Sequence, residues 1–409
     1  MIMYDYAAFS ILGLTICALV ITGTVQVMIT TNTKPEASLN FHVIGDYGEL
    51  HPRWNFTTLP CKVVAESMNN IAGIDPISMV ITTGDNFYAS GKNFSLDSTI
   101  EKVFSDNFFK KSNLKDKEWY LSWGNHDAYF KVNLDKIMTE KYGNVYMHRK
   151  PWNLTKEMDG FKVDFMFLPP EIVCLGVFAS NKIKSHCKSM GVVNQNIDDY
   201  YDWIEEHMVE ISKDPKVYWK IFVIHYPIFS LSIAGMDTES LKFYLLPILR
   251  KYGVDLVLSG HNHHMEYSVS FPDKHKEYIT QDKRDDCQPQ SNINCGGFTI
   301  HCYTKNTTCP DKKKNCKNKI SVESSPGLQN YTQKVVFRKG EALHQVVQGG
   351  GGADLDPFCP KLTSPMSDLL FGLIDFGFTS IKATSSELSI KYYIANTSKL
   401  VFESIIERY

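Results

Sequence analysis

Short apolar runs, separated by longer polar or amphipathic stretches, dominate the chain after its first 40 residues. Runs this short and rich in Val and Ile are typical of buried strands. The chain has five of them: FHVI (41–44), SMVITT (78–83), WYLSW (119–123), KIFVI (220–224) and VDLVLS (254–259). The apolar spacing over 62–72 and 241–253 predicts helices, and Pro247 must bend or break the second one. The alternation of strands and helices predicts an α/β core.

The N-terminal segment has a different pattern, because residues 7–30 contain no charged side chain. The segment is long enough to cross a bilayer, which needs about 20 apolar residues. Its position also fits a secretory signal, although it exceeds the usual signal core of about 7–15 residues and no A-x-A cleavage site follows. We therefore divide the chain into an anchor or signal with a linker (1–34) and one folded domain (35–409), with the uncleaved anchor slightly favoured. Both interpretations place the domain on a lumenal or extracellular face, either membrane-attached or secreted.

Composition narrows the class of protein. The 409 residues carry a net charge of -2, and 43% of them are hydrophobic, so the chain can bury a large core but lacks the basic character of a nucleic-acid-binding protein. Nine cysteines follow Cys17, and their odd number leaves at least one without an intramolecular partner. Six N-glycosylation sequons begin at Asn55, Asn93, Asn153, Asn306, Asn330 and Asn396. Cysteines and sequons together agree with an oxidising compartment.

The stretch from about 268 to 340 interrupts the strand–helix alternation. It contains five cysteines and clustered lysines without sustained periodicity, which predicts a solvated insertion joined by disulfides. Contact of its lysines with anionic lipid or a partner is the alternative. After the insertion, GGGG (349–352) is expected to be flexible, and the alternating pattern over 378–395 predicts a hairpin.

Each of the five predicted strands is followed directly by an unusual polar cluster. The carboxyl ends of parallel strands lie at one edge of a sheet, so we expect these clusters to meet. The candidate ligands are Asp46, Asp85, Asn125, His225, His261 and His263. Carboxylate, amide and imidazole groups suit first-row transition metals, and the set is too large for one tetrahedral ion. Any single cluster is explained equally well as a turn, but their shared position favours a site for two metals.

The clusters stand in the chain as GDYG (45–48), GDNFY (84–88), GNHD (124–127), FVIH (222–225) and GHNH (260–263). This order resembles the calcineurin-like metallophosphoesterases, and more closely the purple acid phosphatases of the small, tartrate-resistant type. The resemblance covers about 40–267 and resumes at VVQGGGG and in the predicted hairpin. It implies an α-β-β-α sandwich, with two mixed β-sheets flanked by helices, in a single domain for which a monomer is favoured. It also implies an acid phosphatase acting on phosphate monoesters.

The resemblance further implies the metal ligands. Gly48 stands where most other members of the superfamily have a metal-binding histidine, and Tyr88 offers a phenolate, a hard donor that favours Fe(III). The implied Fe(III) ligands are Asp46, Asp85, Tyr88 and His263, with Asp85 bridging to a second, divalent ion. That ion, Fe, Zn or Mn, would also be held by Asn125, His225 and His261. His261 and His263 alternate along an extended loop and can point to one side, while His264 points elsewhere. We expect His264 to be a bystander or a residue that supports the ligands.

For the reaction we expect in-line attack by a metal-bound hydroxide on a phosphate ester. The resemblance assigns substrate binding to Asn125 and His126, and His126 would also protonate the leaving alkoxide. Asp127 would orient His126. Two departures from the family stand out. Phe222 replaces a valine, and Ala234 occupies the register of a second substrate histidine, which predicts slower turnover or a changed leaving-group preference.

A scaffold with the same fold, as in the glideosome-anchor branch, is the alternative function. The hydrophobic N-terminus and the basic insertion keep this alternative open, whereas the complete set of seven ligand residues favours catalysis. A phosphodiesterase or protein phosphatase of the wider superfamily is disfavoured by Gly48 and Tyr88.

Overall fold

The computed structural model describes residues 16–21, 24–29, 36–49, 60–88, 95–130, 132–174, 181–190, 198–230, 232, 238–272, 293–295, 298–302, 320–324, 333–356 and 366–409. The chain divides into two compact units, Met1–Ala37 and Ser38–Tyr409. In the first, β1 (Ile16–Ile21) pairs antiparallel with β2 (Thr24–Ile29). Among the described residues, no helix combines the length and hydrophobicity that a membrane crossing requires. The anchor or signal interpretation of residues 7–30 stays a prediction.

The large unit contains an eight-stranded sheet in the order β15-β20-β19-β18-β3-β4-β5-β6. Its parallel half is formed by β3 (Leu39–Ile44), β4 (Met79–Thr82), β5 (Glu118–Leu121) and β6 (Val145–Met147). The other half comprises β18 (Gly377–Ala383), β19 (Glu387–Ile394), β20 (Lys399–Glu407) and β15 (Gln333–Arg338). There β18 and β19 form the predicted hairpin, and β15 runs parallel to β20. The sheet is therefore mixed.

A seven-stranded sheet has the order β17-β11-β16-β10-β9-β8-β7. Its centre is parallel and consists of β16 (Leu343–Gln348), β10 (Leu256–Ser259), β9 (Val217–Val223) and β8 (Phe161–Phe167). Antiparallel strands flank this centre, namely β11 (Met265–Ser270), β17 (Asp368–Leu373) and β7 (Trp152–Met158). All five strands expected from the apolar runs are present, but they are distributed between the two sheets.

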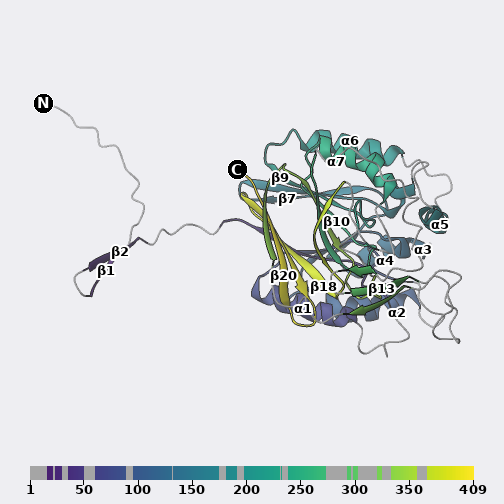
Figure 1. The fold of residues 1–409 in the computed structure, drawn as a ribbon, viewed down its shortest axis with the longest axis horizontal. Helices are drawn as coiled ribbons and strands as arrows, with labels where there is room; N and C mark the ends of the chain where they lie inside the picture. The colour runs from purple at the N-terminus through teal and green to yellow at the C-terminus, as the bar shows by residue number, and fades with distance from the viewer. Residues whose placement is uncertain are drawn as a thin grey trace. The chain divides into compact units, whose positions relative to one another are not determined.

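The two sheets pack face to face, and helices cover their outer faces (Figure 1). Phe41 on β3 meets Phe165 on β8 edge to face, with ring centroids 5.4 Å apart. The Tyr267 hydroxyl on β11 lies 2.7 Å from the Ser404 hydroxyl on β20. One outer core lies beneath α1 (Pro60–Ile74) and the π-helical segment η1 (Ile100–Phe109), and the other beneath α6 (Asp198–Ile211), η3 (Leu241–Leu245) and α7 (Leu246–Lys251). The predicted α-β-β-α sandwich is confirmed.

The predicted helices form as expected. The segment 62–72 lies within α1, and 241–253 is helical in two parts, with Pro247 in the first turn of α7. Proline is tolerated there because the first N–H groups of a helix have no intrahelical partner. Shorter helical pieces are α2 (Leu96–Thr99), α3 (Asn125–Tyr129), α4 (Leu134–Lys141), η2 (Pro170–Cys174) and α5 (Asn181–Met190). A disulfide joins Cys174 to Cys187, and Cys61 is a buried free thiol.

Only parts of the predicted insertion lie among the described residues. Within it, β12 (Ile293–Cys295), β13 (Phe298–Cys302) and β14 (Ile320–Ser324) form a three-stranded antiparallel sheet. Its two ends belong to the main sheets, since β11 extends to Ser270 and β15 begins at Gln333. Of the sequon asparagines, Asn153 and Asn396 are exposed, and the other four fall outside the described residues. Glycosylation of these sites stays a prediction.

Candidate metal centre

The polar clusters meet where the carboxyl ends of parallel strands from both sheets come together. Asp46, Asp85 and Asn125 follow β3, β4 and β5 of the eight-stranded sheet, and the histidine clusters follow β9 and β10 of the seven-stranded sheet. Asp46, Asp85 and His261 adopt positive φ angles of 55°, 50° and 70°. Non-glycine residues rarely occupy this left-handed region, and such conformations cluster at functional sites. The sharp turn after each strand brings these three residues into the shared cluster.

Asp46, Tyr88 and His263 form the first group of donors. The Tyr88 hydroxyl lies 3.3 Å from Asp46 Oδ1 and 3.2 Å from His263 Nε2. His263 Nε2 lies 3.5 Å from the same Asp46 oxygen. Asp46 is fully buried, whereas the His263 side chain is 18% exposed, so this group extends from the interior to the surface.

Asp85, Asn125, His225 and His261 form the second group. Asn125 Oδ1 lies 3.0 Å from His225 Nε2 and 3.1 Å from His261 Nδ1. Asp85 Oδ2 lies 3.4 Å from His225 Nε2. The two groups are continuous, because ligand atoms of Asp46, Asp85 and His225 all lie within 4.8 Å of one another. The structure thus brings together all seven residues that the sequence analysis named as ligands.

Two backbone carbonyls hold the imidazole rings in place. His225 Nδ1 lies 2.9 Å from the carbonyl oxygen of Thr83, and His263 Nδ1 lies 2.7 Å from that of Asp354. An Nδ1–H that donates to a carbonyl leaves Nε2 as the acceptor, which is the usual arrangement of a metal-binding histidine. In both residues this Nε2 is the atom that faces the carboxylates of the cluster.

The glycine at position 48 is required by a close approach of two loops. A Cβ atom there would lie 2.1 Å from the carbonyl oxygen of Asn86 and 2.5 Å from the amide nitrogen of Phe87. The Tyr88 amide, next along the chain, donates to the Gly48 carbonyl at 3.4 Å. Position 48 therefore has no room for a side chain, and the loop that carries Tyr88 packs against the Gly48 backbone.

The run GGGG (349–352) was expected to be flexible, and this prediction is wrong. A Cβ atom at Gly349 would lie 2.0 Å from the Asn262 carbonyl oxygen, and one at Gly351 would lie 2.1 Å from that of Gly45. The amide of Ala353 donates to the Asp46 carbonyl at 2.9 Å. The glycines permit close backbone packing behind the ligand loops, and this packing fixes the run.

The segment after the glycine run supports His263, and the sequence analysis did not identify this role. Besides the Asp354 carbonyl, the carboxylate of Asp356 accepts a hydrogen bond from the His263 amide at 3.1 Å. The available signal was ADLD, two acidic residues directly after a strand and a glycine run. Without a match to another ligand motif, that signal could not be distinguished from an ordinary turn.

His126 lies beside the cluster rather than within either group. Its ring packs on Tyr88, with centroids 4.2 Å apart, and meets Tyr129 at 5.2 Å. Its amide donates to Asp85 Oδ1 at 2.8 Å, and its side chain is 38% exposed. The His126 ring can therefore contact a ligand that enters from solvent, while the Asp85 carboxylate holds the His126 backbone.

Asp127 was expected to orient His126, and its side-chain hydrogen bonds go to two loops around that residue. Its buried carboxylate accepts hydrogen bonds from the amides of Gly124, Asn86 and Phe87 at 2.9–3.1 Å. The Asn86 side-chain amide donates to it at 2.8 Å. Asp127 therefore joins the GNHD turn to the GDNFY loop, and its effect on His126 runs through the backbone.

His264 points away from the donors, as predicted, and belongs to a buried network. His264 Nε2 lies 3.0 Å from Glu266 Oε2, and the Ser230 hydroxyl donates to the same oxygen at 3.0 Å. The Asn262 side-chain amide donates to Ser230 Oγ at 2.7 Å. The network links the loop after β9 to the loop after β10. Ala234, the position of the missing substrate histidine, lies outside the described residues.

Burial and mutual charge shift the pKa values of the cluster. Burial raises the pKa of Asp46 to about 7 against the opposing effect of His225. Burial would also raise the pKa of Asp85, but the charges of His225 and His126 outweigh it and lower that pKa. Burial lowers the pKa of His225, and the Asp85 and Asp46 charges overcome this effect and raise it to about 9. Burial, with Asp85 next, raises the pKa of Tyr88 well above its usual value. Bound cations favour the deprotonated forms, so metal binding here should release protons.

The donor set fits metal ions in spacing as well as in chemistry. Two ligand atoms that share an ion at about 2.1 Å lie about 3.0–3.4 Å apart in tetrahedral or octahedral geometry. Within the two groups the close donor pairs are separated by 3.0–3.5 Å. Buried carboxylates beside imidazoles whose orientation is fixed are what such a site requires.

Comparison with known proteins agrees with this geometry. Residues 40–265 match the family model described as calcineurin-like phosphoesterase. Purple acid phosphatase 17 of Arabidopsis thaliana is 28% identical over 251 residues, which cover 60% of this chain and 68% of that protein. Tartrate-resistant acid phosphatase type 5 of Mus musculus is 26% identical over 251 residues, covering 59% of this chain and 71% of that protein.

Solved structures share the fold at lower identity. A purple acid phosphatase from yellow lupin (Lupinus luteus) seeds superimposes with a TM-score of 0.52 and 16% identity, covering 91% of this chain and 54% of that one. An anchor protein of the inner membrane complex of Plasmodium gives a TM-score of 0.56 and 14% identity, covering 91% and 89%. Since the family model spans more than half of the residues, this chain belongs to the calcineurin-like phosphoesterase family, and the relatives described above are a purple acid phosphatase and a tartrate-resistant acid phosphatase.

Proposed function

We propose that this protein is an acid phosphatase that hydrolyses phosphate monoesters at a binuclear centre of Fe(III) and a divalent ion. Membership of the phosphoesterase family and its acid phosphatase relatives support the reaction class. The observation that carries the metal assignment is Tyr88, whose hydroxyl lies within 3.3 Å of a buried carboxylate and an imidazole. A phenolate in this position is a hard anionic donor and favours a trivalent ion over a divalent one.

In this proposal, Asp46, Tyr88 and His263 hold the Fe(III), and Asn125, His225 and His261 hold the divalent ion, which is Fe, Zn or Mn. Asp85 lies close to donors of both groups and would supply carboxylate oxygens to both ions. When bound, the two ions neutralise phosphate charge and lower the pKa of a water, so that hydrolysis proceeds at acidic pH.

The residues of the chain bind the ester and move the proton. His126 is the partly exposed group beside the donors, and it donates a hydrogen bond to the phosphate and then a proton to the leaving alkoxide. Burial lowers the pKa of His126, and the dianionic ester opposes this shift by favouring the charged ring. Asn125 contributes to substrate binding beside the second group of donors. Asp127 holds the turn that carries His126 against the GDNFY loop.

The metal assignment is tested by expressing the protein with iron and zinc supplied. We expect metal analysis to find two ions per chain, a visible tyrosinate-to-Fe(III) band, and hydrolysis of a chromogenic phosphate ester near pH 5–6, the range in which a strongly acidified water is already ionised. Tyr88→Phe should abolish the band, whereas Tyr142→Phe, a buried tyrosine outside the site, should keep it. A colourless protein that contains only zinc would overturn the iron assignment and leave the phosphatase assignment standing.

A scaffold role is the second candidate, and the ligand set opposes it. A protein that only anchors others has no need of seven donors at coordination spacing.

We further propose a secreted or lumenal location, membrane-attached through residues 7–30 or released, with N-glycans on the exposed Asn153 and Asn396. Glycosidase treatment followed by mass analysis would test the glycans.

A further inference from the structure

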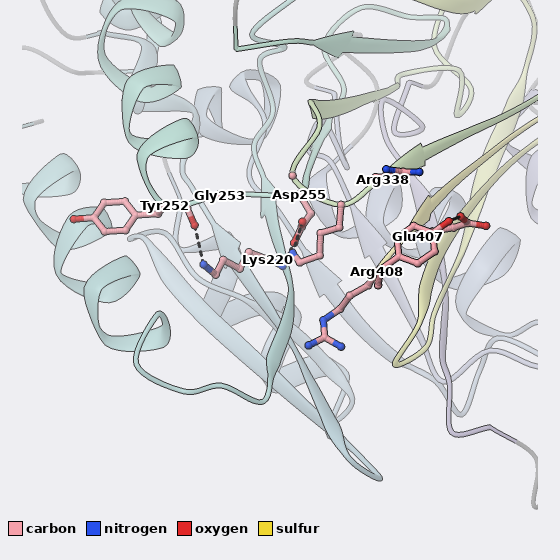
Figure 2. A pocket seen from close by; sticks show the side chains of 10 residues that line it. Lys220, Tyr252, Gly253, Asp255, Arg338, Glu407 and Arg408 are labelled. Atoms are coloured by element: carbon pink, nitrogen blue, oxygen red, sulfur yellow. Dashed lines mark hydrogen bonds and ion pairs between the residues drawn. The ribbon is translucent and has the colours of Figure 1, made fainter.

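A pocket with a mostly basic lining lies beside the residue that precedes β10, Asp255 (Figure 2). Its volume is 810 Å³, and its charged lining consists of Lys220, Asp255, Arg338, Lys339, Glu407 and Arg408. Asp255 precedes β10 and His261 follows it. The length of β10, four residues at about 3.3 Å each, places the pocket roughly 13 Å or more from the metal ligands. The basic pocket is therefore separate from the proposed active site.

The pocket contains more cations than its carboxylates can balance. Four of the lining residues are basic and two are acidic. Lys339 pairs with Asp255, whose second oxygen accepts the Lys220 amide at 2.9 Å. Lys220, Arg338 and Arg408 form no ion pair with any residue in the described ranges. Unpaired cations gathered around a cavity create a positive potential that attracts anions.

Lys220 lies within this positive potential. Its Nζ donates to the Tyr252 carbonyl at 2.7 Å and to the Ser212 hydroxyl at 3.4 Å, both uncharged groups. Burial and the neighbouring Lys339 charge lower the pKa of Lys220, and they outweigh the opposing attraction of Asp255 and Asp164. An anion bound in the pocket would offset both effects, because it adds negative charge beside a half-buried ammonium.

The two arginines are held by aromatic rings. The Arg408 guanidinium lies 3.5 Å from the centroid of the Tyr218 ring, and that of Arg338 lies 5.5 Å from the Tyr409 ring. Cation–π packing orients a guanidinium but leaves its N–H edge free of carboxylate. The planar fork of an arginine matches the oxygens of a phosphate group.

We propose that the basic pocket binds a phosphate-bearing anion at a site distinct from the metal centre. Its volume falls within the roughly 300–1,000 Å³ of small-molecule sites, so it accommodates a phosphate group with attached organic atoms. The ligand is either a free phosphate compound or the phosphorylated headgroup of a lipid. The binding uses cationic side chains only and is independent of the proposed catalysis.

Free phosphate is tested by equilibrium dialysis of the metal-loaded full chain with radiolabelled inorganic phosphate. We compare Arg338→Gln/Arg408→Gln with Lys115→Gln/Lys382→Gln, which removes the same charge from exposed positions elsewhere. The pocket variant should bind one phosphate fewer than the control, or bind it at least about 10-fold more weakly. Both should keep the circular dichroism spectrum and the thermal unfolding midpoint of the wild type, which verifies folding, and Lys220→Gln serves as a second pocket variant.

The lipid source is tested by co-sedimentation with phosphatidylcholine vesicles, with and without a minor fraction of phosphatidylinositol phosphate. Selective loss of vesicle binding in the pocket variants identifies a headgroup site, whereas selective loss of dialysed phosphate identifies a free ligand. Equal behaviour of pocket and control variants in both measurements would overturn the proposal. None of these readouts uses turnover, so the proposed acid phosphatase activity stands or fails separately.

Discussion

The two sheets contribute different chemistry to the candidate metal centre. The eight-stranded sheet supplies the oxygen side, Asp46, Asp85, Tyr88 and Asn125, and the seven-stranded sheet supplies the nitrogen side, His225, His261 and His263. Each of the two donor groups combines both sides, because His263 lies against Asp46 and Tyr88, and His225 lies against Asp85 and Asn125. Neither sheet alone contains a complete set of ligands. The centre therefore forms only when the two sheets pack against each other.

Asp85→Ala gives the largest expected effect, because it removes the one donor that lies between the two groups. Loss of the ions forfeits about 4 kcal/mol or more of transition-state stabilisation, which corresponds to at least a ~1,000-fold loss of kcat/KM. Metal analysis should find neither ion. His225→Ala, on the nitrogen side, should lose the divalent ion and keep the iron band.

The exposed Asp116→Ala is the matched control and should retain both ions and full activity. If Asp85→Ala bound two ions, Asp85 would not be the residue that joins the oxygen and nitrogen sides.

Removal of the metals should destabilise the contact between the sheets, because in the proposed centre each ion would link donors of both sides. A ligand present at about 1,000 times its Kd stabilises the folded state by about 4 kcal/mol. Urea unfolding of chelator-treated and reloaded protein measures the difference. An unchanged free energy of unfolding would mean that the sheets pack equally well without ions and that the centre does not bridge them.

His126→Asn separates catalysis from metal binding on the oxygen side. His126 contacts the cluster through its amide and through the Tyr88 ring, so both ions and the visible band should be retained. Loss of a proton donor typically costs 10²–10⁴-fold, and we expect about a 100-fold fall in kcat. The loss should be smaller for esters with acidic leaving groups such as nitrophenol, since these need little protonation. Equal losses for all esters would contradict the proton-donor role.

The smallest expected effect concerns two buried histidines, one in each sheet. Burial lowers the pKa values of His42 on β3 and His344 on β16 to about 3. The unfolded chain takes up these protons near pH 6.5, whereas the folded chain does not until about pH 3. Stability is therefore lost as the pH falls through this window, by on the order of 2 kcal/mol per histidine at pH 5.

His344→Gln should reduce the loss of unfolding free energy between pH 7 and pH 5 by about this amount, as measured by urea titration at each pH. The exposed His148→Gln is the control and should follow the wild type. A pH dependence that is the same in both variants would show that His344 carries no such penalty.

The sequence predicted the elements of the fold well, and the residues that it named as ligands lie together in the structure. Runs such as VDLVLS and the spacing over 62–72 carry their own structural preference, because period and β-branched content act locally. The candidate ligand residues could be named because the polar cluster of each follows a predicted strand. The roles of Gly349 and Gly351 were misjudged, because a glycine that permits close backbone packing is indistinguishable in sequence from one that gives flexibility.

By itself the sequence determined which chemical groups are available and that each follows the end of a strand. Only the tertiary structure decided that these strand ends belong to two different sheets, that Asp127 joins two loops rather than holding the His126 ring, and that the Thr83 and Asp354 carbonyls orient the metal-facing imidazoles. The physical reason is the distance along the chain over which each feature is determined. Strand formation depends on neighbours in the chain, whereas ligand distances of about 3 Å depend on how two sheets pack, and no local pattern encodes that packing.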